Sequence, residues 1–474
     1  MTASLDPAPK TEPAMDKLRR FLEERRKAGK AASSFEQFEE DLHRLVSEAE
    51  CEAVGEELER YDVDVPLVTI DGVPHRRVVR CEETYFSPAG PVRVERSPYG
   101  TRSGPGEKAS CPMELQAGIV EGKWTPRAAK QALWFVANLT PGAVEELYER
   151  LGGLMPSKTS LDRLPKKVSA KWEEERQHFE ASLREQEEVP ANAVAVGVSL
   201  DGVMVPMKDG ERKKKREEAA AQGKETRGPA GHQEVGCGTV TFYDKSGELL
   251  SAVRLGRMPE GGKATLKSML RDELAWVREK RPDLTVVRLA DGAKDNWTFL
   301  DALPVKGPAV IDFFHAAEHL NEALEAAYGE GTPKAQAQFQ KLRHLLRHEN
   351  GGVEKVIRSL LNLHHAHPGS RVVERELKYF RKGRHKMQYA SIAAKNLPIG
   401  TGVTEAACKT LATQRRKCSG MAWRNEGGQA ILSLRSFIQS KRFDAAWDLL
   451  AAGYKKRVAV PDNVVPLHQR RKRQ

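Results

Sequence analysis

Three acidic residues stand where they could bind divalent metal ions. Asp201 ends the apolar run 194–200, and Asp291 ends a second apolar run, 285–290. Glu405 lies further along, in a stretch with helical character. Carboxylate oxygens are the ligands that hard divalent cations prefer, and two such ions about 3.5–4 Å apart can drive phosphodiester cleavage and transfer. The three acids therefore predict a two-ion site for phosphodiester chemistry.

Each acid also has an ordinary structural interpretation. Asp201 and Asp291 are each followed by glycine, and Asp-Gly is a frequent turn dipeptide. Glu405 is followed four residues later by Lys409, the spacing of a surface ion pair worth roughly 0.2–0.5 kcal/mol. Taken singly, the acids favour these interpretations. Together, in strand, strand and helix order within a basic chain, they favour the metal site.

The chain carries a surplus of positive charge. Its 474 residues include 77 Lys and Arg against 66 Asp and Glu, which gives a net charge of +11 and a pI near 9.2. A basic surplus favours polyanionic partners, because binding releases the counterions of a nucleic acid. The charge indicates nucleic acid without proving it, since many basic proteins bind none.

The sequence shows no sign of a membrane protein or a secreted protein. Its first residues lack the apolar core of a signal peptide, and no run of about 18 apolar residues could span a membrane. The six cysteines are scattered without a C-x-x-C pair, so neither a disulfide framework nor a zinc knuckle is indicated. We expect a reducing cytoplasm and no membrane partner.

Apolar runs and helical spacings alternate around the first two acids. Their order predicts three strands, a helix, a strand, a helix and a strand, as in an RNase H-like mixed sheet with helices on its faces. Residues 316–395 have no strand pattern and hold most of the histidines, so we expect an all-α insertion into this α/β domain. The predicted strands cover 194–200, 237–243, 249–255, 285–290 and 309–314, and the helices cover 262–279 and about 297–300.

The remaining sequence predicts smaller units. Residues 1–60 are charged, with helical spacing, and their first part is expected to be disordered. Residues 61–112 contain two hairpin patterns and then a linker rich in Gly, Pro and Ser. The predicted order continues with a helical region at 113–190, a catalytic core at 191–315 and 396–450, the insertion at 316–395 and a basic tail at 451–474, whose last run, 469–474, is expected to be disordered.

The helical region 113–190 is a candidate for DNA binding. Two helices around a short glycine turn are the arrangement of a helix-turn-helix, in which Lys158 and Arg163 of the second helix would contact DNA. Ordinary helix packing explains the pattern equally well. Pro165 is expected to shorten the second helix, because proline breaks the hydrogen-bond ladder.

Five short motifs follow one another in a fixed order. They are Leu200-Asp201-Gly202-Val203, Ala290-Asp291-Gly292-Ala293, Ile311-Asp312-Phe313-Phe314-His315, Ile399-Gly400-Thr401-Gly402-Val403-Thr404-Glu405 and Arg415-Arg416-Lys417-Cys418-Ser419-Gly420-Met421-Ala422-Trp423. The series resembles bacterial insertion-sequence transposases of the ISKra family, in the wider Mutator-like DDE group. The resemblance covers about residues 115 to 450, whereas residues 1–60 and the Lys-rich segment 208–229 match no pattern of that family.

The resemblance implies an RNase H-like catalytic core that binds two Mg²⁺ ions, or Mn²⁺ in their place, and moves DNA. Asp201, Asp291 and Glu405 match the three catalytic, metal-binding acids. Asp312 and His315 match the D-x-x-H element of the wider group, with His315 near the reacting groups and Asp312 behind the metal ligands. Water would first cut the DNA at the element end, and the released 3′-hydroxyl would then attack the target.

The resemblance also implies partners and a place in the cell. Double-stranded DNA would be the partner, both at the element ends and at the target. A homo-oligomer is expected, because two element ends must be held together. The expected location is the bacterial nucleoid, in the cytoplasm. A transposase relic that binds DNA without cutting it is the non-enzymatic alternative.

The helix of Glu405 suggests further contacts with DNA. Steps of four, three and four residues from Glu405 lead along one helical face, and basic residues there would hold phosphates beside the metal ions. Trp423 could stack on a displaced base or, equally, pack in the core. The basic residues are Lys409, Arg415, Arg416 and Lys417.

A rival enzyme class comes from one short motif. The segment from His315 to His319 spells H-x-x-E-H, the inverted zinc-protease motif. On a helix, its two histidines would bind zinc and Glu318 would act as the base. A five-residue pattern is weak evidence in a region rich in histidine, so the zinc peptidase is kept only as the rival hypothesis.

Overall fold

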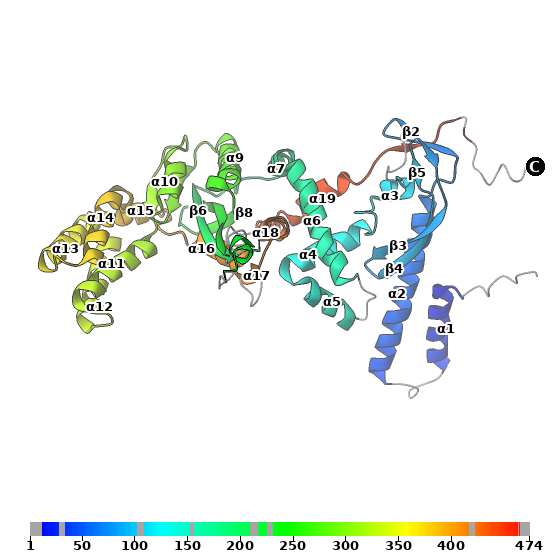
Figure 1. The fold of residues 1–474 in the computed structure, drawn as a ribbon, viewed down its shortest axis with the longest axis horizontal. Helices are drawn as coiled ribbons and strands as arrows, with labels where there is room; N and C mark the ends of the chain where they lie inside the picture. Colours follow the sequence, from blue (N-terminus) through cyan, green and yellow to red (C-terminus); the bar gives the residue numbers. More distant parts are fainter. Residues whose placement is uncertain are drawn as a thin grey trace, which may run out of the picture. The chain divides into compact units, whose positions relative to one another are not determined.

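Figure 1 shows the computed structural model of the chain. The structure describes residues 12–27, 34–101, 109–151, 156–208, 217–224, 231–416, 422–462 and 464. Contacts divide the chain into two compact units, Met1–Arg176 with Asp444–Gln474, and Gln177–Phe443. The three acids lie in the second unit. Residues 444–450, which we grouped with the catalytic core, pack with the first unit instead.

A five-stranded mixed sheet forms the centre of the second unit. Its strands lie in the order β10, β9, β6, β7, β8; β7 is antiparallel to β6 and β8, whereas β9 is parallel to β6 and β10. With α9 after β8 and α10 after β9, the predicted order of strands and helices is confirmed. The bounds are β6 (Ala195–Pro206), β7 (His232–Tyr243), β8 (Leu249–Arg257), α9 (Ala264–Lys280), β9 (Thr285–Ala290), α10 (Lys294–Asp301) and β10 (Ala309–Ile311).

The strands differ from their predicted spans at the ends. β6 continues past Leu200 to Pro206 because β7, which begins at His232, pairs with it throughout. The fifth strand was predicted to reach residue 314, which is wrong. Asp312 caps a helix there by accepting a hydrogen bond from the backbone N–H of His315 at 2.7 Å, so the two phenylalanines between them are helical.

Helices cover both faces of the sheet at β7. A Cβ on Gly236 would lie 2.8 Å from the Leu266 side chain of α9, so the missing side chain lets this helix approach. Cys237, the next residue, points to the opposite face, where it packs with Cys408 and Leu432. The helical segments on and next to this second face are α16 (Gly402–Ala407), the π-helix η4 (Cys408–Thr413), α17 (Gln414–Arg416) and α18 (Asn425–Gln439).

An all-helical insertion follows β10, as predicted, and residues 313–395, all of them described, contain no strand. α11 packs against α12 and α14, and α13 packs against the same two helices. Figure 1 shows these helices gathered beside the sheet of their unit. The insertion consists of α11 (Phe313–Tyr328), α12 (Pro333–His348), α13 (Gly352–Ala366), α14 (Arg371–Gly383), the 3₁₀ turn η3 (Arg384–Lys386) and α15 (Tyr389–Ala393).

Both predicted hairpins occur in the first unit. The turn Asp71-Gly72 joins the first pair of strands with φ values of 48° and 83°, and positive φ at both positions is what a tight two-residue hairpin turn requires. The second pair is also antiparallel. The hairpins are β1 (Leu67–Ile70) with β2 (Val73–Arg77), and β3 (Cys81–Ser87) with β4 (Gly90–Arg96).

Two segments predicted to be irregular also contribute strands to the first unit. β5 (Tyr99–Gly100) lies within the predicted linker and pairs with β2. β11 (Val458–Ala459) lies within the predicted tail and pairs with β1. The rest of the linker at 102–108 and the basic run at 469–474 lie outside the described residues.

The helices of the first unit include the candidate helix-turn-helix. α6 packs against α4 and α5 and continues through Pro165, so the expectation that this proline shortens it is wrong. Burial of Leu161, Leu164 and Val168 offsets the hydrogen bond that the proline removes. The helices are α3 (Pro112–Ala117), α4 (Pro126–Asn138), α5 (Pro141–Arg150), α6 (Lys158–Glu174) and α19 (Phe443–Ala452), and α7 (Arg176–Glu185) begins the second unit.

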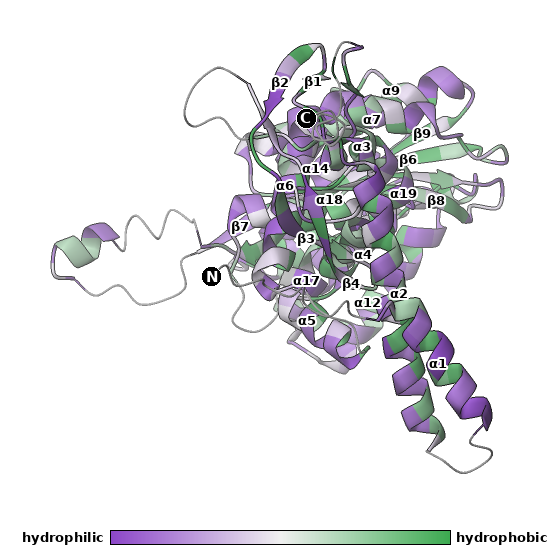
Figure 2. Cartoon of the chain, turned by 90° about the vertical axis from the view of Figure 1, so that its right-hand side faces the viewer, coloured by the Kyte–Doolittle hydropathy of each residue, from purple (hydrophilic) through white to green (hydrophobic). Residues whose placement is uncertain are grey.

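The predicted helical N-terminal region is confirmed. α1 (Ala14–Lys27) and α2 (Phe35–Arg60) pack together, with the Phe21 and Phe38 rings stacked at 5.7 Å. Figure 2 shows α1 with mostly hydrophilic residues, as expected for a helix that packs through one narrow stripe. Disorder was predicted for residues 1–13, and residues 1–11 of that stretch lie outside the described part.

Candidate active site

Asp201 lies inside a strand. It pairs with Cys237 of β7, and the next residue, Gly202, pairs with Gly236. The turn interpretation of Asp201-Gly202 is therefore wrong, and so is the expectation that Asp201 ends its strand. A Cβ on Gly202 would lie 1.9 Å from Oε1 of Glu234. The Glu234 side chain therefore lies across β6 at Gly202, where a larger residue would push it aside.

Asp291 follows β9 directly and comes beside Asp201. Ser199 of β6 pairs in parallel with Leu289 of β9, and each acid lies two residues further along its own chain segment. Residues two apart in a strand share a face, and neighbouring strands lie about 4.8 Å apart. This register brings the two carboxylates to one level of the sheet. The negative charge of Asp291 accordingly contributes to a raised pKa of Asp201.

The Asp201 carboxyl is partly buried in surroundings that disfavour its charge. Burial is the largest cause of its raised pKa, and the charge of Asp291 adds to it. The backbone N–H of Gly202, which donates to Oδ1 at 2.7 Å, opposes the rise. Oδ2 lies 3.8 Å from Sγ of Cys408. A cation between the two acids would relieve their repulsion, so the pair has the electrostatics of a metal site.

Asp291 uses one carboxylate oxygen to hold its own loop. Oδ1 accepts hydrogen bonds from the backbone N–H of Ala293 at 3.1 Å and from the Asn296 amide at 3.2 Å. The indole N–H of Trp297 donates to the Asp291 carbonyl at 2.6 Å. Oδ2 has no hydrogen-bond partner among the described residues. One oxygen is therefore held in place while the other is available to a cation.

Glu405 lies on a helix that is fastened to the same face of the sheet. Thr404, its neighbour, has its hydroxyl 2.7 Å from the hydroxyl of Thr239 in β7. Cys408, three residues after Glu405, reaches Asp201. The Glu405 side chain is exposed, whereas Asp201 is half-buried. The helix thus places Glu405 on the same face of the sheet as Asp201 and leaves its carboxylate open to solvent.

Asp312 connects this helix to the insertion. Besides capping α11, it accepts hydrogen bonds through Oδ2 from the Thr401 backbone N–H at 2.5 Å and the Thr401 hydroxyl at 3.0 Å. The same hydroxyl lies 2.9 Å from Oε1 of Glu405. A hydroxyl has one proton to donate, so the two carboxylates compete for it. Asp312 is buried and acts on Glu405 through Thr401.

The three acids do not form a tight cluster. Among the described residues, the one group of His, Cys, Asp and Glu with ligand atoms all within 4.8 Å of one another is His319, Glu322 and Glu376. Two ions about 3.5–4 Å apart do not require their outer ligands to touch, because only the bridging ligand contacts both. The two-ion site formed by these three acids therefore stays a prediction.

Lys263, which the sequence did not single out, lies beside Glu234 and Asn296, close enough to Asp201 to affect its charge. Its ammonium is 2.8 Å from Glu234 and 3.4 Å from Oδ1 of Asn296, whose amide binds Asp291. Its positive charge lowers the pKa of Asp201, against the larger effect of burial. Lys263 has φ of 53° and ends the turn before α9. The preceding Gly-Gly pair was the signal for this turn.

A π-helix interrupts the helix of Glu405. The Thr413 hydroxyl donates to the carbonyl of Cys408, five residues earlier, at 3.3 Å. A wider turn rotates the following residues relative to α-helical spacing. Lys409 is exposed but Ala412 is fully buried, so the single helical face expected beyond Glu405 is wrong.

The predicted phosphate contacts near Glu405 differ in exposure. Lys409 is exposed, whereas Arg415 is 5% exposed, with its guanidinium 5.5 Å from the centre of the Trp423 ring. Trp423 forms a bridge with Met207 and packs against the buried cluster around η4. These contacts support the packing interpretation of Trp423 and make Arg415 part of the same packing.

Other predicted DNA contacts are placed only in part. The side chain of Arg416 and all of Lys417 lie outside the described residues, as does most of the Lys-rich segment 208–229. In the first unit, Lys158 and Arg163 are both exposed on α6. They remain candidates for contact with a ligand on that unit's surface.

The H-x-x-E-H motif lies on α11, as the rival hypothesis requires. The Nε2 atoms of His315 and His319 are 3.2 Å apart. Glu376 of α14 meets Nδ1 of His319, on the other side of the ring, so it is not placed as a third ligand for an ion between the two Nε2 atoms. Glu318, the base of the motif, has a side chain that is 75% exposed. This geometry does not favour a peptidase.

Comparisons with known proteins give little beyond the geometry. No protein-family model and no curated protein matches the chain. A solved structure, the Drosophila P element transposase strand transfer complex, is similar over 72% of this chain and 83% of that chain, with 11% identity and a TM-score of 0.25. A likeness at that TM-score does not define the fold. Function therefore has to be argued from the site.

None of the helices that the structure describes is both long enough and apolar enough to cross a membrane.

Proposed function

We propose that this chain is a DDE transposase, akin to the ISKra family, in which Asp201, Asp291 and Glu405 hold two Mg²⁺ ions. The observation that carries the proposal is the register of β6 and β9, which brings Asp201 and Asp291 to one level of the sheet, on the face where the helix of Glu405 is anchored. The order of strands and helices supports an RNase H-like core for this unit.

The donor atoms fit Mg²⁺ better than a softer metal. All three proposed ligands are carboxylates, which hard cations prefer, and Mg²⁺ keeps several waters when protein supplies few ligands. Asp201, Asp291 with its free Oδ2, and Glu405 would hold the ions. When bound, the two ions supply a reactive water at neutral pH and stabilise the attacking and leaving oxygens.

The protein's own groups would position these acids. The Ala293 backbone and the Asn296 amide orient Asp291 through its other oxygen. The Thr401 hydroxyl holds Glu405 or, by donating to Asp312, releases it. Lys263 offsets part of the negative charge around Asp201. His315, in the first turn of α11, is proposed to contact the substrate near these groups.

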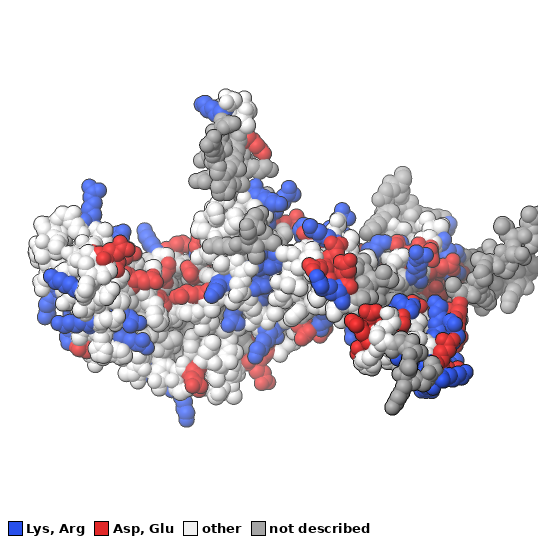
Figure 3. Space-filling model, turned by 90° about the horizontal axis from the view of Figure 1, so that it is seen from below, with Lys and Arg blue, Asp and Glu red and all other residues white. Residues whose placement is uncertain are grey.

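DNA binding would rest on basic residues in both units. Lys158 and Arg163 of α6 and Lys409 of η4 are exposed and could each contact a phosphate. Figure 3 shows Lys and Arg interspersed with Asp and Glu over the visible face. We propose that these three lysine and arginine residues make separate phosphate contacts. Two element ends must meet, so a homo-oligomer on DNA is part of the proposal.

The test is DNA cleavage and strand transfer with purified protein. DNA from the two flanks of the gene, with Mg²⁺ or Mn²⁺, should be cut to leave a 3′-hydroxyl and then joined to a target plasmid. Asp201→Asn should abolish both steps while DNA binding remains. Asp295→Asn is the matched control, because this acid is also in the second unit but pairs with Lys267 at the surface.

Two outcomes would contradict the proposal. Strand transfer that persists in Asp201→Asn would remove the metal assignment. Specific binding of the flanking DNA without any cleavage, with either metal ion, would favour the relic that binds DNA and does not cut it.

A further inference from the structure

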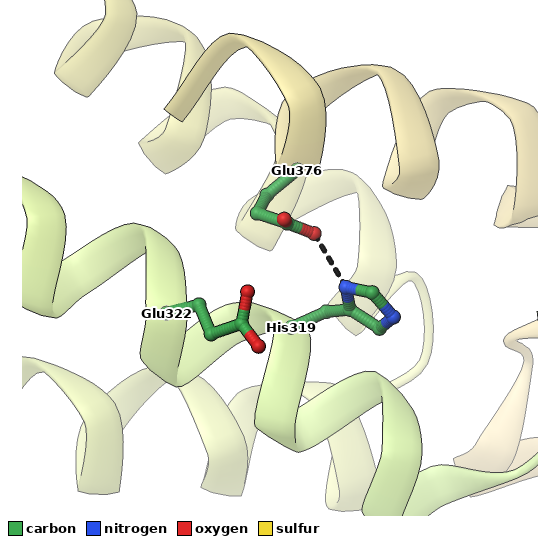
Figure 4. Close-up of side chains that lie close together, drawn as sticks. All are labelled: His319, Glu322 and Glu376. Carbon is green, nitrogen blue, oxygen red and sulfur yellow. Dashed lines mark hydrogen bonds and ion pairs between the residues drawn. The ribbon is translucent and has the colours of Figure 1, made fainter. Parts of the chain in front are cut away.

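A mixed group of nitrogen and oxygen donors lies in the helical insertion, apart from the three proposed catalytic acids. His319 and Glu322 come from α11 and Glu376 comes from α14, and one ligand atom from each lies within 4.8 Å of the other two. Figure 4 shows the three side chains pointing toward one another between the two helices. Imidazole with carboxylates is a donor set of Zn²⁺ and similar transition metals, whereas Mg²⁺ sites use oxygen.

We propose that α11 and α14 hold a divalent transition-metal ion, Zn²⁺ by its donor set, through Nδ1 of His319 and the carboxylates of Glu322 and Glu376. The proposal concerns a site distinct from the magnesium site and does not depend on the transposase assignment. Three protein ligands would leave one position of a four-coordinate ion open to water.

Glu376 is a deeply buried donor of this group. Its side chain is fully buried, and a buried carboxylate is costly unless its charge is compensated. The compensating partners are Nδ1 of His319 and the guanidinium of Arg375, whose side chain is 59% exposed. The insertion therefore holds a carboxylate inside a helical bundle, facing the histidine, where a metal ion could take the place of Arg375.

The surroundings of His319 leave its Nδ1 able to act as a ligand. Its Nε2 lies 3.2 Å from Nε2 of His315, so it can carry the ring proton and donate it there. The Tyr379 ring stacks on the imidazole with centroids 4.0 Å apart and fixes its plane. A hydrogen bond to the remote nitrogen is how proteins set the tautomer of a metal-binding histidine.

Binding of the metal ion would require small movements of side chains that now form hydrogen bonds and ion pairs with one another. Nδ1 of His319 and Oε2 of Glu376 are 2.5 Å apart, and ligation by both at zinc distances needs about 3.4 Å between them. Arg375 now pairs with both Glu322 and Glu376. Its side chain is 59% exposed, so it can swing into solvent. Arg375 would thus compete with the metal ion for the two carboxylates.

The same site would connect the insertion to the sheet. Tyr379, which stacks on His319, also lies against the loop after β9, where a Cβ on Gly292 would come within 2.6 Å of its Cε2. An ion that clamps α11 to α14 would therefore hold the residue that packs on the Asp291 loop.

The test is metal binding to the untagged, full-length protein. A calorimetric titration with Zn²⁺ should show about one tight site per chain. Co²⁺ bound in place of Zn²⁺ should give the visible absorption spectrum of a four-coordinate ion. His319→Ala and Glu376→Gln should each weaken binding at least about tenfold, the usual result of removing a ligand or its support. Asp201→Asn should bind Zn²⁺ normally, which separates this site from the catalytic one.

Two further variants make the result decisive. His344→Ala is the matched control, because His344 and His348 form another pair one turn apart on α12, with rings 4.8 Å apart. It should leave the tight site intact. Arg375→Ala should tighten binding by about tenfold, since it removes the competing cation, and this gain cannot come from misfolding. Absence of a tight site, or equal loss in the His319 and His344 variants, or no gain in Arg375→Ala, would overturn the proposal.

Discussion

The carboxylate site on the sheet and the histidine–glutamate group in the insertion differ in how far the charge of their buried carboxylates is compensated. Asp201 is partly buried, and its pKa lies above its ordinary value. The negative charge of the neighbouring Asp291 raises this pKa further. Glu376 is more deeply buried, yet its pKa lies below its ordinary value, because His319 and Arg375 donate hydrogen bonds to it. One region leaves negative charge unsatisfied, and the other satisfies it within the protein.

This difference indicates which region is built to act on an external cation. Unsatisfied carboxylates are destabilising in the absence of a ligand, and proteins retain such groups where function requires them. In the proposed function, relief of the repulsion between Asp201 and Asp291 would favour the binding of Mg²⁺ at the sheet site. A metal in the insertion must first displace Arg375, so selectivity there would come from the imidazole nitrogen.

The largest expected effect distinguishes an acid of the sheet site from an acid of the insertion surface. Glu405→Gln should lower Mg²⁺-dependent DNA cleavage by about 10³-fold, because losing a metal ligand removes several kcal/mol of transition-state stabilisation. Glu354→Gln, on an exposed position of α13, should cleave like the unmodified protein. Single-turnover cleavage rates measure the difference, and similar rates for both variants would remove Glu405 from the site.

The second prediction concerns the residue that joins the two regions. Asp312→Asn should lower the free energy of unfolding by about 2–3 kcal/mol, because an amide cannot accept from His315 and Thr401 with both of its polar atoms, and a buried donor loses its partner. Ser370→Ala, which removes the cap of α14 alone, should cost about 1 kcal/mol. Urea unfolding of the two variants gives the comparison, and equal losses would mean that Asp312 is only a helix cap.

Much of the second unit could be predicted from its sequence. Periodic apolar runs and glycine turns predicted the order of strands and helices around Asp201 and Asp291 because each element has its own local pattern. The end of β10 was predicted wrongly. Phe313 and Phe314 are apolar and suit a strand as well as a helix, and the sequence alone does not show that Asp312 caps a helix there.

The site itself was less predictable. Lys263 approaches Asp201 only through the fold, and no local pattern marks a lysine as the counter-ion of an acid far away in sequence. The π-helix after Glu405 and the burial of Arg415 against Trp423 also arise from packing. In the insertion, the motif showed His315 and His319 but could not show Glu376, which reaches them from another helix.

The third prediction removes the positive charge beside the sheet acids. Lys263→Met should raise the pKa of Asp201 further, because the ammonium now lowers it. The fall in cleavage rate on the acidic side of the pH–rate profile, where protonation of Asp201 would compete with metal binding, should therefore move to higher pH, with up to about a tenfold lower rate within that range, one pKa unit corresponding to about 1.4 kcal/mol. Lys267→Met, one turn further along in α9 and paired with Asp295, is the control. A pH–rate profile that does not move would exclude this role for Lys263.

The smallest effect tests whether the sheet acids are strained in the protein without metal ions. Because the pKa of Asp201 is raised in the folded state, the folded protein holds more protons than the unfolded chain between the ordinary and the raised pKa. The free energy of unfolding therefore decreases as pH rises through that window. Asp201→Asn should remove this decrease and stabilise the protein by about 1 kcal/mol above the window, with little difference at more acidic pH.

Urea unfolding at several pH values, with chelator present, measures that stabilisation. Asp283→Asn is the opposite control: the pKa of this exposed acid is lowered by its hydrogen bond to Arg281, so its loss should not stabilise the protein at any pH. A destabilised Asp201→Asn at neutral pH would show that Asp201 supports the fold. In that case uncompensated charge at Asp201 and Asp291, in contrast to the compensated charge of Glu376, would no longer explain why the chain keeps two acids side by side.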